Sequence, residues 1–175
     1  TEITISQHLG FKDTQFDIYR RDPTPYKSIF APFTGLMIVE NVSFWLMTGV
    51  LERFPKLRIV FVEPSLTSML NWVRMLDGSW QRGRERIFPG VKKSPMETFH
   101  EQMFMTFIGG DRHSLDQRHE VGVENIMWST DFPHPASTWP KSREVVNQLF
   151  EGVPADERKL IVCDKAARVS RLAAA

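Results

Sequence analysis

Four ionisable residues follow short apolar stretches of this sequence: His8, Glu63, Asp131 and, three positions further on, His134. Imidazole nitrogen and carboxylate oxygen are ligands that a divalent ion such as zinc takes in proteins. A carboxyl or imidazole group beside such an ion can also move a proton to or from a bound water or a substrate. We therefore predict that His8 and Asp131 bind a metal, and that Glu63 or His134 carries out the proton transfer.

The segments that would position these residues are predicted strands that alternate with predicted helices. Residues 11–32 contain three prolines and no clear period, which favours a long loop. The alternation predicts one α/β domain over residues 1–175, with a parallel sheet covered by helices. Ligands of parallel α/β sheets bind beyond the carboxyl ends of the strands, so the four residues should meet there. The expected strands are 3–8, 57–63, 103–108 and 125–131, and the expected helices are 33–54, 65–86, 95–101, 114–121, 140–151 and 155–172.

Composition argues against several classes of protein. Lys and Arg number 22 against 21 Asp and Glu, and the formal net charge of +1 does not favour nucleic-acid binding. No stretch approaches the ~18 apolar residues of a membrane span, and no signal sequence begins the chain. A single cysteine, Cys163, excludes an internal disulfide framework and is expected to be buried. We expect a cytoplasmic protein with a small-molecule substrate.

A motif around Asp131 resembles a known family. Residues 128–134, WSTDFPH, are similar to the W-(G/S)-(S/T)-D-(Y/F)-P-H signature of amidohydrolase-related proteins. This branch of the amidohydrolase superfamily includes aminocarboxymuconate-semialdehyde decarboxylase. The similarity extends to FPKLRIVF at 54–61, to residues 120–126 and to Ala-Ala-Arg at 166–168.

The resemblance implies a (β/α)₈ TIM barrel in which the four expected strands are strands five to eight. His8 then stands at the strand-five metal ligand, and Asp131 at the strand-eight aspartate that binds metal and handles the proton. Glu63 occupies the strand-six position that is a catalytic histidine in the decarboxylase. Lys165 stands where relatives usually carry asparagine.

The family's first strand carries an H-x-H or D-x-H motif with further metal ligands, and this chain has no counterpart of it. A closed barrel needs eight strands and typically about 250 residues. Four strands would leave two unpaired edges and an apolar flank. We expect either that an N-terminal half has been lost, which the start at Thr1 favours, or that two chains complete each other as a homodimer.

The resemblance implies a metal-dependent hydrolase or non-oxidative decarboxylase that acts on a small carboxylated or amide-bearing metabolite and is inactive as this chain alone. Zinc is the expected ion, with manganese or iron as alternatives. A non-catalytic half-barrel that persists by association with another chain is the alternative function.

Structural roles are the competing interpretation for each site residue. His8 would then form a structural hydrogen bond, Asp131 would start a turn, and Glu63 would favour a helix dipole. His134 would then be an ordinary loop residue. His100, His113 and His119 lie outside the expected strand ends and are predicted to be surface residues.

Overall fold

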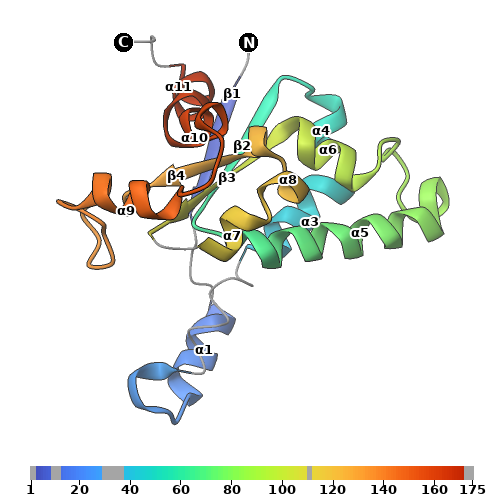
Figure 1. The fold of residues 1–175 in the computed structure, drawn as a ribbon. Coiled ribbons are helices and arrows are strands. Elements are labelled where there is room, and N and C mark those ends of the chain that lie inside the picture. The colour runs from blue at the N-terminus through green and yellow to red at the C-terminus, as the bar shows by residue number, and fades with distance from the viewer. Residues whose placement is uncertain (1–2, 9–12, 29–37, 110–111, 172–175) are drawn as a thin grey trace.

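The computed structural model describes residues 3–8, 13–28, 38–109 and 112–171. Its centre is a four-stranded parallel sheet in the order β1-β2-β3-β4 (Figure 1). The strands are β1 (Ile3–His8), β2 (Leu57–Val62), β3 (Met103–Ile108) and β4 (Ile126–Ser129). The predicted parallel α/β fold is therefore confirmed, and the membership of these strands in an eight-stranded barrel stays a prediction.

Helices connect consecutive strands. Ser65 begins α5 as expected, because its side chain accepts a hydrogen bond from the Ser68 amide. The helical segments are α1 (Asp13–Arg21), η1 (Pro25–Lys27), α3 (Val39–Met47), α4 (Val50–Arg53), α5 (Leu66–Ile87), α6 (Pro95–Gln102), α7 (Arg112–Asp116), α8 (Arg118–Val121), η3 (Val123–Asn125), α9 (Ser142–Leu149), α10 (Ala155–Lys159), the π-helical η4 (Leu160–Asp164) and α11 (Lys165–Ser170).

Several predicted boundaries were wrong. The expected loop over 11–32 contains α1 and η1, and the rest of that expectation falls partly on residues outside the described ranges. The expected helix over 33–54 is divided because Gly49 takes a left-handed conformation, with φ +70°, between α3 and α4. The last strand ends at Ser129, so Asp131 lies in the loop after it.

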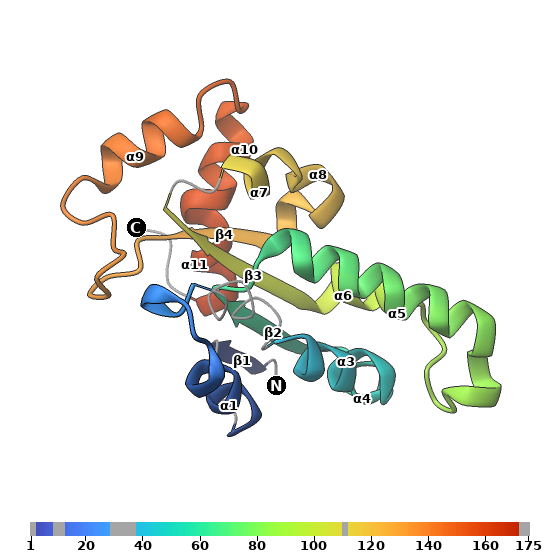
Figure 2. The ribbon, with the colours of Figure 1, turned by 90° about the horizontal axis from the view of Figure 1, so that it is seen from below.

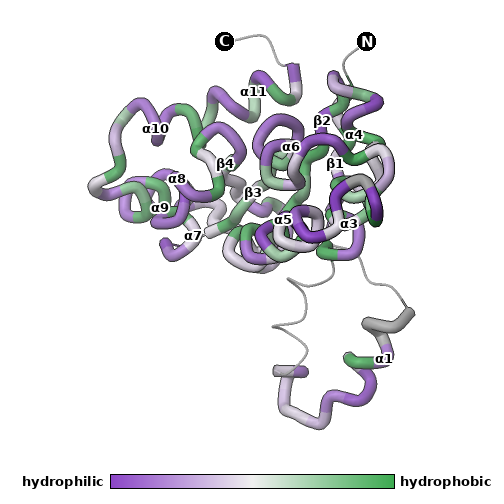
Figure 3. Tube along the Cα trace, turned by 90° about the vertical axis from the view of Figure 1, so that its right-hand side faces the viewer, coloured by the Kyte–Doolittle hydropathy of each residue, from purple (hydrophilic) through white to green (hydrophobic). Residues whose placement is uncertain are grey.

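One face of the sheet carries the main hydrophobic core. Ile59, Phe61, Met103 and Met105 are completely buried on this face. They pack with residues of α3, α5 and α6, which lie together on one side of the strands (Figure 2). Along α5, hydrophilic and hydrophobic residues alternate around the coil, as expected of a helix with one buried side (Figure 3).

The other face of the sheet is covered by the last helix. Val60, Phe104 and Met127 form a second cluster, and Ala166 and Val169 of α11 pack against it. The backbone carbonyl of Val169 also accepts a hydrogen bond of 3.1 Å from the Thr4 hydroxyl. This face would line the interior of a closed barrel, and α11 shields part of it from water.

Two buried amide side chains tie the starts of the strands together. The Asn125 amide donates hydrogen bonds of 2.8 Å to the carbonyl oxygens of His100 and Met103. The Gln102 amide donates to the carbonyl oxygens of Phe54 and Leu57 at 3.0 and 2.9 Å. These bonds join the segments that precede β2, β3 and β4 to one another.

The ends and edges of the sheet are more open. Strand β1 has β2 as its neighbour in the described sheet, and Ile3 and Ile5 are 55% and 37% exposed.

Cys163 is exposed, which corrects the expectation that it is buried, because it lies on the solvent side of η4. Within the described ranges, no helix is long and apolar enough to cross a membrane.

Candidate functional site

The predicted site residues come from the carboxyl ends of neighbouring strands. His8 is the last residue of β1, Glu63 directly follows β2, and Asp131 lies two residues after β4. Between them, the Thr106 hydroxyl of β3 accepts a hydrogen bond of 3.1 Å from the Glu63 backbone amide. The register of the parallel sheet therefore places all of these residues along one edge.

The side chains of the four predicted residues form a continuous series of contacts. His8 Nε2 lies 3.5 Å from Glu63 Oε2, and His134 Nδ1 lies 2.9 Å from Asp131 Oδ2. The carboxyl groups of Glu63 and Asp131 are within hydrogen-bonding reach of each other. The two carboxyl groups are the inner members, with side chains 17% and 10% exposed, whereas the histidines are 60% and 66% exposed.

Both carboxylate residues have an unusual backbone conformation. Glu63 has φ +62° and Asp131 has φ +59°, in the left-handed region that residues other than glycine and asparagine adopt at a cost. Such conformations cluster at active sites, where the surrounding structure holds them in place. Here the Glu63 amide is held by Thr106, and the Asp131 amide donates to the Ser129 hydroxyl at 3.3 Å.

The pKa of Glu63 is raised above its ordinary value. Burial is the largest cause, followed by the hydrogen bond to Asp131 and the repulsion from its charge. His8 and His134 act in the opposite direction but do not outweigh these effects. Glu63 therefore releases its proton at a higher pH than an ordinary glutamate does.

The inner oxygen of Asp131, Oδ2, is buried. His134 Nδ1 lies 2.9 Å from this oxygen and 3.3 Å from the Ala136 amide nitrogen. An imidazole nitrogen either carries a proton or offers one lone pair, so Nδ1 donates to Asp131 or accepts from Ala136, but not both. The tautomer of His134 therefore decides whether the buried Asp131 oxygen has a hydrogen-bond donor.

The donor types suit a divalent ion, but the number of donors falls short. Imidazole nitrogen and carboxylate oxygen are ligands of zinc, manganese and iron. Among the described residues, no group of three or more His, Cys, Asp or Glu side chains is arranged to hold a metal. The assignment of His8 and Asp131 as metal ligands stays a prediction, and further ligands would have to come from other residues.

The structure brings together all four of the residues selected from the sequence, and their roles stay predictions. His100, His113 and His119 are exposed and lie outside this series of contacts, as expected. Sequence reasoning gave no sign that the Trp128 indole nitrogen would be buried without a hydrogen-bond partner among the described residues.

Comparison with solved structures shows a shared fold. 5-Carboxyvanillate decarboxylase from Sphingomonas paucimobilis matches with a TM-score of 0.75 and 23% identity, over 98% of this chain and 50% of that one. 2,6-Dihydroxybenzoate decarboxylase from Rhizobium matches with a TM-score of 0.71 and 20% identity, over 98% and 52%. A dihydroxybenzoic acid decarboxylase from Polaromonas sp., with bound manganese and the inhibitor 2-nitroresorcinol, matches with a TM-score of 0.71 and 17% identity. This match covers 99% of this chain and 51% of that one.

The chain spans about half the length of these solved structures. Among curated proteins none matches it. The protein family described as amidohydrolase matches residues 3–172, which is nearly the entire chain. Because this match covers well over half of the sequence, the chain belongs to the amidohydrolase family.

Proposed function

We propose that this chain forms part of a metal-dependent decarboxylase that acts on a carboxylated aromatic metabolite. The observation that carries the proposal is that Glu63, Asp131 and His134 come together at the carboxyl edge of the sheet, with the Glu63 and Asp131 side chains largely buried. The solved structures named above that share this fold are decarboxylases of aromatic acids. That likeness supports the choice of decarboxylation over hydrolysis.

His8 and Asp131 are the residues that would hold the metal. A divalent ion supplies Lewis-acid polarisation of a substrate oxygen when it is bound. Manganese is the ion we favour, because a structure with this fold contains it, and zinc and iron suit the same donors. The remaining ligands would come from a second copy of the chain or from the other half of a barrel, since the described residues offer no three-ligand group.

Decarboxylation replaces the carboxylate on a ring carbon by a proton. As the bond to CO₂ breaks, its electron pair stays on the ring carbon, which must then receive a proton. Glu63 is suited to supply this proton because its raised pKa keeps the carboxyl group protonated at a pH where other glutamates are ionised. Asp131 lies within hydrogen-bonding reach of Glu63 and can return a proton to it. His134, 66% exposed, connects Asp131 with solvent.

A manganese titration of the purified 175-residue chain tests the proposal. Asp131→Asn should lower manganese affinity at least tenfold, because it removes one of the two proposed ligands that this chain offers. The matched control is Asp116→Asn, which removes an exposed carboxylate paired with Arg112 and should bind as the unaltered chain does. Equal manganese binding by Asp131→Asn and the unaltered chain would refute the metal assignment.

The reaction is tested by incubating the manganese-loaded chain with 2,6-dihydroxybenzoate and measuring resorcinol and CO₂. Formation of both products that is abolished in Asp131→Asn supports decarboxylation by this site. Manganese binding without product, together with a stable dimer in light scattering, would favour the alternative of a non-catalytic half-barrel that persists by association.

A further inference from the structure

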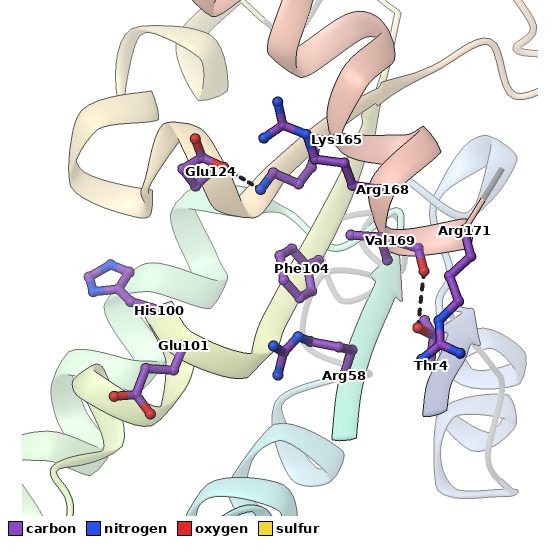
Figure 4. Close-up of a pocket in the computed structure, with 10 residues that line it drawn as sticks. All are labelled: Thr4, Arg58, His100, Glu101, Phe104, Glu124, Lys165, Arg168, Val169 and Arg171. Atoms are coloured by element: carbon purple, nitrogen blue, oxygen red, sulfur yellow. Dashed lines mark hydrogen bonds and ion pairs between the residues drawn. The ribbon is translucent and has the colours of Figure 1, made fainter. Parts of the chain in front are cut away.

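A pocket lies where the strands begin, at the end of the sheet opposite the candidate site. Its volume is about 340 Å³, and its walls come from the first residues of β1, β2 and β3 and from α11. Figure 4 shows Thr4, Arg58 and Phe104 on the strand side and Lys165, Arg168 and Val169 on the helix side. The pocket is therefore separate from the carboxyl edge that carries His8, Glu63 and Asp131.

Cations outnumber acids around this pocket. Arg58, Lys165, Arg168 and Arg171 line it, against Glu101 and Glu124. Glu101 forms an ion pair with Lys93, with 2.6 Å between Lys93 Nζ and Glu101 Oε2. Its charge is therefore neutralised by a residue outside the pocket. Glu124 pairs with Lys165. Arg58 and Arg168 consequently give the pocket positive charge that its own acids do not compensate.

Lys165 is the most unusual of these cations because it is buried. Only 8% of the residue is exposed, and its ammonium lies 5.7 Å from the centre of the Phe104 ring. Its carboxylate partner, Glu124, has a side chain that is 63% exposed and is therefore poorly shielded from water. Burying an ammonium is costly unless anionic partners surround it. One solvent-exposed carboxylate meets that need only in part.

Two guanidinium groups complete the arrangement and have donors to spare. Arg58 donates one hydrogen bond, of 3.2 Å, to the Pro55 carbonyl oxygen and has four further N–H groups. No described residue forms a hydrogen bond or an ion pair with the Arg168 guanidinium. Arg168 lies three positions after Lys165 in α11, a spacing that puts both cations on neighbouring positions of one helix side, where like charges repel.

We propose that this pocket binds a small polyvalent oxyanion, such as a phosphate or a dicarboxylate group, between Arg58 and Lys165. The Lys165 ammonium lies 5.7 Å from the centre of the Phe104 ring, and in Figure 4 Arg58 lies on the other side of that ring. Guanidinium groups suit this ligand because their planar fork of donors matches phosphate and carboxylate oxygens. Phe104 and Val169 provide an apolar wall for a carbon skeleton attached to the anionic group. The proposal does not depend on the metal site or on decarboxylation.

Calorimetric titration of the purified chain with inorganic phosphate, at constant ionic strength, tests this proposal. We expect saturable binding of one phosphate per chain, weakened at least about tenfold in Arg58→Gln, the loss typical of a hydrogen bond to a charged group. The Arg58 side chain can be replaced without opening the main core. Arg86→Gln, an exposed arginine near the far end of α5, is the matched control and should bind as the unaltered chain does.

A parallel titration with malonate distinguishes the two sources of the oxyanion. Tighter binding of phosphate assigns the pocket to phosphorylated ligands, and tighter binding of malonate assigns it to dicarboxylates. Absence of binding by both anions, or equal affinity in the unaltered chain and in Arg58→Gln, would overturn the proposal. Equal weakening by Arg86→Gln would overturn it too, because attraction by total charge rather than by this pocket would then explain the binding.

Discussion

Replacing Glu63 by glutamine should stabilise the metal-free protein near neutral pH. The Glu63 carboxyl group is 17% exposed and lies beside Asp131, and both burial and that neighbour raise its pKa. Ionising it therefore costs more free energy in the folded protein than in the unfolded chain. Glutamine has nearly the same shape and no charge to bury. The backbone amide of residue 63 keeps its hydrogen bond to Thr106 in either case.

The dependence on pH follows from the direction of the pKa shift. The unfolded chain releases the Glu63 proton near the ordinary value of 4.5, whereas the folded protein keeps it to a higher pH. Folding stability contributed by this group is complete below pH 4.5 and falls as the pH rises through the raised folded-state pKa. Above this pH range, Glu63→Gln should therefore be more stable than the unaltered protein. In acid, this difference in stability should disappear.

We expect Glu63→Gln to raise the free energy of unfolding by about 1 kcal/mol. Exposed charge pairs contribute up to about this amount, and both carboxyl groups here are largely buried. Glu63→Asn should add about 1 kcal/mol more, because asparagine tolerates the left-handed φ of +62° at this position. For a chain of this length, each kcal/mol corresponds to a rise of roughly 2–4 °C in Tm.

Thermal unfolding in the presence of EDTA, near neutral pH and again below pH 4.5, measures these effects. Glu151→Gln is the matched control, because Glu151 is exposed and its change should leave Tm within about 1 °C. A lower Tm of Glu63→Gln near neutral pH would refute the argument from burial and repulsion. A gain that persists unchanged in acid would refute the assignment of the effect to ionisation.

Two further predictions concern the packing around the sheet, both measured by urea unfolding. Asn125→Leu should destabilise the protein by about 2–3 kcal/mol, because two buried carbonyl groups lose their donors, and a loss below about 1 kcal/mol would contradict this. Gly49→Ala should cost more than about 2 kcal/mol, because a Cβ there would collide with the Gly90 carbonyl oxygen at a φ of +70°. Gly152→Ala, with φ +77° and open space around it, should cost only about 1 kcal/mol, and equal losses would refute the collision.

Much of the fold could be predicted from local patterns. The apolar runs at 57–62 and 103–108 bury both faces of their strands, and this requirement leaves a continuous hydrophobic signature in the sequence. The strand 103–108 was predicted with its observed bounds, and Ser65 was predicted as the cap of α5. Helix interruptions were missed, because the sequence periodicity continues across Gly49 although the backbone turns there.

The candidate site divides in the same way between sequence and tertiary structure. Types and spacing of residues selected His8, Glu63, Asp131 and His134, because a strand that ends in an ionisable residue is visible in the sequence itself. Their mutual contacts were decided by the parallel register, which aligns strand ends that lie far apart along the chain.

The raised pKa of Glu63 and the pocket at the start of the strands belong to tertiary structure alone. Burial and the approach of Asp131 raise the pKa of Glu63, and neither can be recognised in the residues around position 63. Lys165 can be read from the sequence, but its position over Phe104 results from α11 crossing the second face of the sheet. Periodicity reports which side of an element is buried, whereas the electrostatics of a side chain depend on partners brought close by the packing of distant elements.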